Sequence, residues 1–206
     1  MSKLCVPEGM RVGLVDGDLR LIGNMLPLVT VLTSPDNDNT LYFNENGLLH
    51  REDGPARKVS YETKHGFEYW YKNGLLHREN GPACVYEEGI TEWWLNGNRH
   101  REDGPAREYK DGHKEWYQHG KLHREDGPAV EKTDGDKLWY QHGKLHREYG
   151  PAVEKANGNK EWYQHGKFHR EDGPACEWAS GYKEWWVNGI EYSKEEFELA
   201  VNKLTA

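Results

Sequence analysis

The sequence has few of the residues that build a thick apolar core or a membrane span. Hydrophobic residues make up 35% of its 206 residues, and the mean hydropathy is −1.03. It contains no run of about 18 apolar residues, the length that crosses a membrane. Residues 1–10 carry one lysine and no apolar segment of signal-peptide length. These absences predict a chain that has no membrane span and remains in the cytoplasm.

The sequence also lacks the short motifs that mark common catalytic and metal sites. We find no nucleophile elbow, phosphate-binding loop, HExxH or paired CxxC. The cysteines Cys5, Cys84 and Cys176 are odd in number and unpatterned, which favours reduced thiols. Cys84 and Cys176 occupy equivalent places in a repeat, whereas catalysis needs one unique geometry. We therefore predict no enzymatic activity, no catalytic residue, no cofactor and no metal.

Positive charge is in deficit. Acidic residues outnumber Lys and Arg, 35 to 27, so the net charge is −8. Binding to nucleic acid without sequence preference, or to an anionic membrane, needs a basic surface, and the charge argues against both.

Aromatic residues are abundant, with nine Trp, twelve Tyr and four Phe. Since each buries roughly 150–250 Å², one Trp and one Tyr per repeat can supply most of a thin core, and a disordered chain is not expected.

The chain is organised around a repeated heptapeptide, His-Arg-Glu-Asp-Gly-Pro-Ala. It occurs unchanged at 50–56, 100–106, 123–129 and 169–175. Two further copies have one change each, because Asn80 and Tyr149 stand in the place of the Asp. Successive copies begin 27, 23, 23, 23 and 23 residues apart. A fixed period of this length is typical of repeat folds, in which each unit buries its apolar face against its neighbours.

Each repeat is predicted to form a β-hairpin and a link. In the copy that starts at Gly127, residues 128–132 read as a strand, Asp134-Gly135 as a turn and 137–141 as the returning strand. A second turn and an extended segment follow, and the motif Gly supplies a turn conformation that a Cβ would oppose. One repeat has four extra residues. If each arm of that hairpin contains two of the extra residues, Trp70 stays on the same face as the equivalent Trp of the other repeats, because side chains alternate with period two.

The two ends of the chain differ from the array. Residues 1–40 are predicted to form an N-terminal β cap that contains a hairpin around residues 16–18. Residues 41–192 form the array of about six repeats. Residues 193–206 form an amphipathic helix with a capping box from Ser193 to Glu196, and its apolar stripe consists of Phe197, Ala200, Val201 and Leu204. The predicted fold class is all-β: an elongated antiparallel ribbon of 23-residue hairpin repeats with a short C-terminal capping helix.

This pattern resembles the MORN repeat, and most closely the bacterial and phage variant of antitoxin type. The likeness covers about residues 41–192, and its positions in one repeat are Trp116, Tyr117, Gly120, Lys121, His123 and Gly127. The chain departs from the family in having Arg-Glu-Asp after the His, where MORN units usually have Gly. The resemblance implies a hairpin ribbon that contacts proteins and sometimes lipids. It also implies a bacterial or phage-infected cell, where small binding proteins neutralise host factors, and it carries over no catalytic residue.

The His-Arg-Glu-Asp segment is the first candidate site. In an extended segment His123 and Glu125 share one face, while Arg124 and Asp126 share the other. A metal or ligand stripe is one interpretation, although a metal needs convergent ligands rather than a line of equal ones. We favour a structural role, in which Arg pairs with carboxylates of neighbouring repeats and His donates to a backbone carbonyl. This structural row consists of His50, His77, His100, His123, His146 and His169.

Adjacent aromatic residues form the second candidate site. They point to opposite faces of a strand, so we expect one buried, structural row: Trp70, Trp93, Trp116, Trp139, Trp162 and Trp185. The next residue of each repeat would face solvent as a binding surface, together with the motif arginines. This predicted binding face consists of Tyr71, Trp94, Tyr117, Tyr140, Tyr163, Trp186, Arg101, Arg124, Arg147 and Arg170. Tyr, Trp and Arg are enriched in protein interfaces, and bases also stack on such rows.

A second set of histidines precedes the turn Gly of the middle repeats. His119, His142 and His165 stand where other repeats have Asn73, Asn96 and Asn188. An exchange of Asn for His indicates a backbone position with positive φ rather than a metal site or a pH switch.

Three functions fit these patterns. The first is a non-enzymatic scaffold that binds and neutralises a protein partner through its aromatic row and acidic surface, as an antitoxin or a phage inhibitor of host defence does. The second is a protein that sequesters a nucleotide or another small ligand in clefts between repeats. The third, a membrane-associated scaffold, is disfavoured by the charge. Identical repeats also make a homodimer through an open sheet edge plausible.

Overall fold

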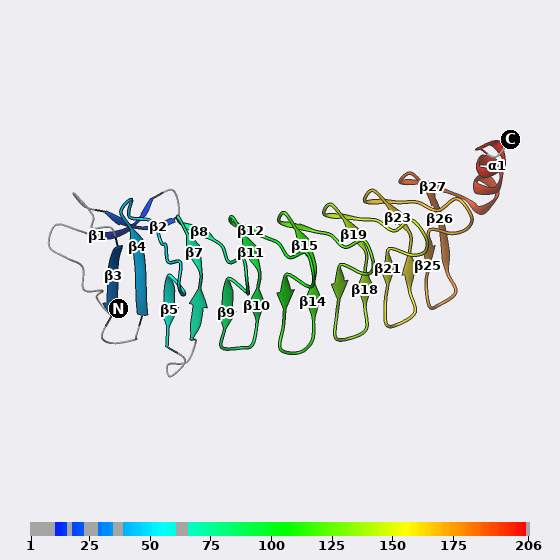
Figure 1. The fold of residues 1–206 in the computed structure, drawn as a ribbon. Coiled ribbons are helices and arrows are strands. Elements are labelled where there is room, and N and C mark those ends of the chain that lie inside the picture. Colours follow the sequence, from blue (N-terminus) through cyan, green and yellow to red (C-terminus); the bar gives the residue numbers. More distant parts are fainter. Residues whose placement is uncertain (1–10, 16–17, 23–28, 35–38, 61–65, 205–206) are drawn as a thin grey trace. The chain divides into compact units, whose positions relative to one another are not determined.

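The computed structural model describes residues 11–15, 18–22, 29–34, 39–60 and 66–204. The chain forms two compact units, Met1–Lys110 and Asp111–Ala206. Regular structure in the described residues is almost entirely β-strand, with one helix, α1 (Lys194–Leu204). The predicted all-β fold of antiparallel hairpin repeats with a short C-terminal helix is thereby confirmed (Figure 1).

The first unit contains a two-stranded hairpin, a larger antiparallel sheet and two small hairpins. The hairpin pairs β1 with β2, and the larger sheet has the order β3-β4-β5-β6-β9-β10-β13. The small hairpins pair β7 with β8 and β11 with β12. The strands are β1 (Arg11–Val15), β2 (Asp18–Ile22), β3 (Val29–Ser34), β4 (Asn39–Asn44), β5 (Arg57–Val59), β6 (Phe67–Tyr69), β7 (Tyr71–Lys72), β8 (Leu75–Leu76), β9 (Cys84–Tyr86), β10 (Thr91–Glu92), β11 (Trp94–Leu95), β12 (Asn98–Arg99) and β13 (Arg107–Glu108).

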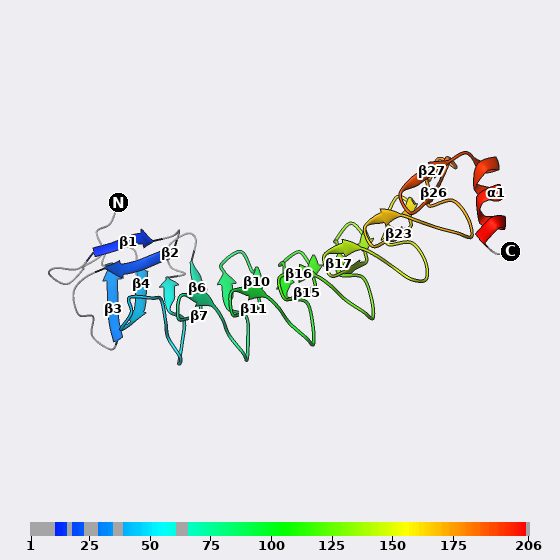
Figure 2. The ribbon, with the colours of Figure 1, turned by 90° about the horizontal axis from the view of Figure 1, so that it is seen from above.

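The second unit repeats this arrangement more regularly, and from above each repeat is seen as a wedge-shaped turn of the chain (Figure 2). Its sheet has the order β14-β17-β18-β21-β22-β25-β26-β27, and its small hairpins pair β15 with β16, β19 with β20 and β23 with β24. The strands are β14 (Lys114–Glu115), β15 (Tyr117–Gln118), β16 (Lys121–Leu122), β17 (Val130–Glu131), β18 (Lys137–Leu138), β19 (Tyr140–Gln141), β20 (Lys144–Leu145), β21 (Val153–Glu154), β22 (Lys160–Glu161), β23 (Tyr163–Gln164), β24 (Lys167–Phe168), β25 (Cys176–Glu177), β26 (Lys183–Val187) and β27 (Ile190–Tyr192).

The returning strand of each regular repeat is not continuous, which corrects the single strand predicted at 137–141. β18 ends at Leu138 and pairs with β17 and β21, whereas β19 begins at Tyr140 and pairs with β20. Trp139 lies at the break. Its N–H donates to the carbonyl of Ala152 at 2.8 Å, and its carbonyl accepts the N–H of His146 at 3.0 Å. Each regular repeat therefore contributes two strands to the main sheet and a separate small hairpin beside it.

The small hairpins turn through two residues with positive φ, as the Asn-for-His exchange predicted. The non-glycine members have φ between 49° and 54°, and they are Asn73, Asn96, His119, His142, His165 and Asn188. The glycine that follows each of them also has positive φ, as in Gly143 at 82°. Two successive positive φ angles are characteristic of the tight turn that matches strand twist.

The long repeat keeps its aromatic residue in place. β5 and β6 have three residues each and pair from Arg57–Tyr69 to Val59–Phe67, whereas β17 and β18 have two each. Trp70 donates to the carbonyl of Ala83 at 2.8 Å, as Trp93 does to Ala106 at 2.7 Å. The inserted residues thus lengthen the hairpin without displacing Trp70. Residues 61–65, where the predicted insertion continues, lie outside the described residues.

The centre of the regular repeats is thin and consists mainly of small residues. The Ala that ends each motif is fully buried, with 0% exposure, and these residues are Ala56, Ala83, Ala106, Ala129, Ala152 and Ala175. The next position is also buried at Val130, Val153 and Cys176. A larger apolar cluster lies at the start of the array, where Leu32, Leu41, Phe43 and Leu49 surround Ala56. Because the repeats have little apolar volume, polar side chains must supply part of the packing.

Both ends fit the sequence predictions where they are described. β1 and β2 form the expected N-terminal hairpin, although its turn at residues 16–17 lies outside the described residues. At the other end, Ser193 Oγ accepts the N–H of Glu196 at 3.2 Å, and Glu196 accepts the N–H of Ser193 at 2.9 Å. This is the predicted capping box. Phe197 is buried, and within the described part of the chain no helix is long and apolar enough to cross a membrane.

Candidate functional site

The motif arginine lies over the ring of the tryptophan eight residues before it. The distance from the guanidinium carbon to the indole centroid is 3.8–4.1 Å in five repeats. The pairs are Arg78 on Trp70, Arg101 on Trp93, Arg124 on Trp116, Arg147 on Trp139 and Arg170 on Trp162. Such a stack is attractive because the cation meets the negative face of the ring. The arginine therefore supplies packing that the thin centre lacks.

Hydrogen bonds fix the same arginine to its own loop. Arg124 donates from Nε to Asp126 at 2.9 Å, and from Nη1 to the carbonyl of Pro128 at 3.2 Å and to Glu131 at 3.0 Å. Asp126 lies in the same motif, whereas Glu131 lies in the next repeat, so Arg124 also pairs with a carboxylate of a neighbouring repeat. The hydrogen bond from Arg124 also lowers the pKa of Asp126. With its donors engaged in this way, Arg124 braces the loop.

This bracing explains the motif glycine, for which the sequence had suggested a special backbone conformation. The backbone of Gly127 lies outside the left-handed region, but a Cβ there would come within 2.9 Å of the Arg124 guanidinium carbon. Gly54 and Gly104 face Arg51 and Arg101 at 2.8 Å. The requirement at these positions is therefore space for the arginine. The equivalent Gly has positive φ only in the two copies in which Asn or Tyr replaces the motif Asp, at Gly81 and Gly150.

The motif histidine joins one repeat to the next, but it does so as an acceptor. His146 Nδ1 accepts the backbone N–H of His165 at 3.1 Å, and His123 accepts that of His142 at 3.2 Å. Equivalent bonds run from Asn73 to His50, from Asn96 to His77 and from Asn188 to His169. Our expectation that His donates to a backbone carbonyl is therefore wrong. An Nδ1 that accepts an N–H cannot carry a proton, so this hydrogen bond requires the neutral ring with its proton on Nε2.

The acceptor role makes stability depend on pH. Burial lowers the pKa of His146, the neighbouring His165 ring lowers it further, and Glu148 opposes the shift. The folded-state pKa thus lies below the unfolded value of 6.5. The stabilisation by the neutral His146 ring is therefore complete above the unfolded pKa, and it is lost as the pH falls through the folded-state pKa.

We expect His146→Ala to lower the free energy of unfolding by about 1 kcal/mol at pH 7.5, since the His165 N–H loses its partner. The difference from the native protein should shrink at pH 5, as measured by urea unfolding at both values. His146→Asn is the matched control because its side-chain oxygen accepts a hydrogen bond and does not titrate. A difference of equal size at both pH values would contradict this role of His146.

The bracing leaves the acidic side chains of each loop exposed. The motif Glu is 61–88% exposed in five copies, namely Glu52, Glu79, Glu102, Glu125 and Glu171, and Glu148 is also exposed. The motif Asp is 83–84% exposed at Asp53, Asp103, Asp126 and Asp172, although each accepts a hydrogen bond from its arginine. We call the exposed carboxylates of one unit its acidic edge. In the second unit this edge consists of Glu125, Asp126, Glu148, Glu171 and Asp172.

The predicted aromatic binding face is less accessible than we expected. Both aromatic rows are half-buried, rather than one being dry and the other wet. Tyr117 and Tyr163 donate to Glu115 and Glu161 at 3.0 and 3.1 Å, and Trp94 and Trp186 donate to Glu92 and Glu184 at 3.0 and 3.2 Å. Burial raises the pKa of Tyr140 and Tyr163. Tyr71 also packs against the apolar cluster at the start of the array.

The thiols and potential metal ligands do not form a reactive centre in the described residues. Cys84 and Cys176 are buried, and burial raises the pKa of each thiol to about 12. A thiol attacks as the thiolate, so these cysteines are held in an unreactive form. Across the described ranges, no three His, Cys, Asp or Glu side chains gather in a way that could hold a metal ion.

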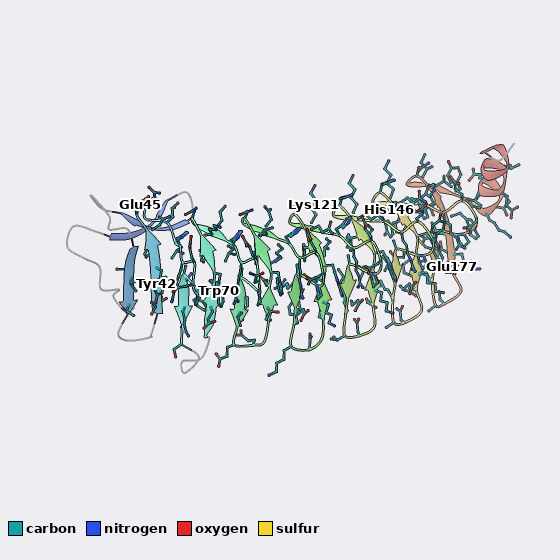
Figure 3. The ribbon with its side chains drawn as sticks, viewed as in Figure 1. Tyr42, Glu45, Trp70, Lys121, His146 and Glu177 are labelled. Atoms are coloured by element: carbon teal, nitrogen blue, oxygen red, sulfur yellow. The ribbon has the colours of Figure 1, made fainter. Side chains whose placement is uncertain are left out.

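A different row of charge lies at the small hairpins of the second unit. Lys121, Lys144 and Lys167 are exposed there, and Figure 3 shows Lys121 in one of these hairpins. Their stems pack over the glycine turn of the next repeat, with Lys121 Cβ 3.6 Å from the position of a Cβ on Gly143. The second unit thus presents lysines from its small hairpins and carboxylates from its motif loops.

Comparison of the chain with models of known protein families finds no match, and comparison with curated proteins also finds none.

The sequence predicted that the acidic surface takes part in the contact, but it did not single out these carboxylates or Tyr149. One feature of the sequence indicated the exposed Glu. Residues two apart share a face, so Arg124 and Asp126 bind each other and leave Glu125 exposed on the other face. A second signal was the departure from the motif at Tyr149, whose exposure is 82%. A tyrosine ring that replaces a carboxylate at so exposed a position marks a candidate contact.

Proposed function

We propose that this chain is a non-enzymatic repeat scaffold that binds a protein partner through its acidic edge and neutralises it. The observation that carries the proposal is the exposure of one Glu per repeat, 61–88% in five copies, on loops where the motif Arg stacks on an aromatic ring. A fixed loop loses little conformational freedom on binding, which favours affinity. A row of like charge attracts a partner of opposite charge and sets its orientation. The partner we propose therefore presents a strip of Lys and Arg residues.

The MORN-type resemblance adds a setting to this proposal. In that setting the chain acts in the cytoplasm as an antitoxin or as a phage inhibitor of a host defence protein, and blocks its partner by occupying a basic surface. The alternative of nucleotide binding relied on free Arg side chains beside exposed rings. It is less well supported, because the Nε and Nη1 donors of Arg124 are already engaged and both aromatic rows are half-buried.

The test is capture of the partner from a lysate of the organism that encodes the chain. We compare the native protein with a triple variant, Glu125→Gln, Glu148→Gln and Glu171→Gln, which removes three charges and preserves shape. The expected result is a stoichiometric basic protein that the native chain captures and the variant binds about tenfold more weakly, since three exposed pairs contribute roughly 0.2–1 kcal/mol each. Its dissociation constant should rise with salt concentration.

The matched control replaces the other exposed row of the same unit, with Lys121→Gln, Lys144→Gln and Lys167→Gln. This control should bind the partner at least as tightly as the native chain does. Binding that survives the Glu variant and is lost in the Lys variant would refute the acidic edge. A thermal shift with nucleotides and no captured protein would favour the small-ligand alternative.

A further inference from the structure

Tyr149 is the one aromatic side chain among the motif loops. The equivalent residue is Asp in four copies and Asn80 in the fifth. Tyr149 is 82% exposed, and its arginine is stabilised without it, because Arg147 donates to Glu154 at 2.7 Å and to the carbonyl of Pro151 at 3.0 Å. The fold therefore does not require a ring at this position.

A cleft of about 370 Å³ opens beside Tyr149, between its loop and the next loop at 169–172. Trp162 lies in its lining together with Glu148, Glu171 and Asp172. Sites for small ligands and side chains commonly measure about 300–1,000 Å³. The cleft is thus large enough for one long side chain of a partner.

The charge of the cleft in the second unit is negative. Its lining contains two guanidiniums, Arg147 and Arg170, and three carboxylates, Glu148, Glu171 and Asp172. The equivalent cleft of the first unit, of about 420 Å³, is balanced. There Arg51, Lys72 and Arg78 match Glu52, Asp53 and Glu79, and Asp53 stands in the place of Tyr149. The two clefts therefore form a natural pair with and without the ring and the excess charge.

We propose that Tyr149, Glu148, Glu171 and Asp172 form a receptor for one Arg or Lys side chain of the partner. This inference rests on the proposed function. A cation is attracted both to the face of a tyrosine ring and to nearby carboxylates. The exposed ring supplies the apolar contact that a row of carboxylates lacks, so the receptor fixes the register of a basic segment along the acidic edge.

The repeat also sets the spacing of that segment. Each regular repeat adds two strands to the sheet, and strands lie about 4.7–4.9 Å apart, so equivalent loops are about 10 Å apart. Three residues of a polyproline II segment span about 9 Å and complete one turn, so every third side chain lies on the same face. The partner segment therefore has the polyproline II conformation and carries a basic residue at every third position, with one basic side chain at Tyr149 and its neighbours near Glu125 and Asp172.

The probe is a pair of seven-residue peptides with identical composition, three Arg and four Gly or Ser residues. One has Arg at positions 1, 4 and 7, and the other has the three Arg residues adjacent. Both are measured on the full chain by fluorescence anisotropy at low salt. We expect the spaced peptide to bind at least about threefold more tightly. Tyr149→Asn, which copies the native Asn80, should weaken it about two- to fivefold, and Tyr149→Phe should retain binding.

The matched control is Asp53→Tyr, which adds a ring at the equivalent place of the first unit's cleft without the excess of carboxylates and should not improve binding of the spaced peptide. Equal binding of the two peptides, or unchanged binding by Tyr149→Asn, would overturn the receptor. If Tyr149→Asn binds as the native chain does while the triple Glu variant does not, the receptor falls and the acidic edge stands. If neither variant affects either peptide, both proposals fail.

Discussion

Arg124→Ala is expected to lower the free energy of unfolding by about 2–4 kcal/mol, the largest effect of any loop substitution. The side chain covers Trp116 at 4.1 Å and donates to Asp126, Glu131 and the carbonyl of Pro128. Removing it uncovers the ring and leaves the carbonyl without this donor. A cation–ring stack is worth about 0.5–1 kcal/mol and a hydrogen bond to a charged group about 1.5–3 kcal/mol. Urea unfolding followed by tryptophan fluorescence measures the loss.

Lys132→Ala is the control for Arg124→Ala. Lys132 is an exposed cation of the same unit, and its only described ion pair joins it to Asp136 at 3.4 Å. Exposed pairs of this kind contribute about 0–1 kcal/mol. If Arg124→Ala were no more destabilising than Lys132→Ala, the arginine would not brace the loop.

Ala152→Leu is expected to destabilise the second unit by about 3 kcal/mol, at the upper end of the usual effect of overpacking. Ala152 has 0% exposure, and its carbonyl accepts the N–H of Trp139. Three added carbons must therefore displace the chain at the point where the strand breaks. The same change at the exposed Ala156 should alter stability by less than about 0.5 kcal/mol. Equal effects at the two positions would contradict a centre built from small residues.

The fold was predictable wherever a local rule acts on neighbouring residues. The period and the Gly positions gave the hairpins, the exchange of Asn for His gave the positive φ at His142, and Ser193 with Glu196 gave the helix start. The break at Trp139 was not predictable, because it depends on a hydrogen bond to Ala152 in the next repeat. Local pattern cannot separate one bent strand from two strands in different sheets.

The site was less predictable than the fold because its side chains have more than one available partner. Interface statistics selected Arg124 and Tyr163 as contacts, but in the folded chain Arg124 binds its own loop and Tyr163 binds Glu161. Likewise, His146 can donate or accept, and only the position of the His165 N–H decides between them. After these pairs form, the motif Glu side chains remain exposed. The sequence alone does not distinguish each of them from any other solvated surface residue.

The most direct test of the binding surface is an NMR titration of the ¹⁵N-labelled full chain with the spaced arginine peptide. If the acidic edge of the second unit is the contact, the largest amide shifts occur at Glu125, Asp126, Glu148, Tyr149 and Glu171. Shifts concentrated instead at Tyr117, Tyr140 and Tyr163, or at the lysines of the small hairpins, would contradict it.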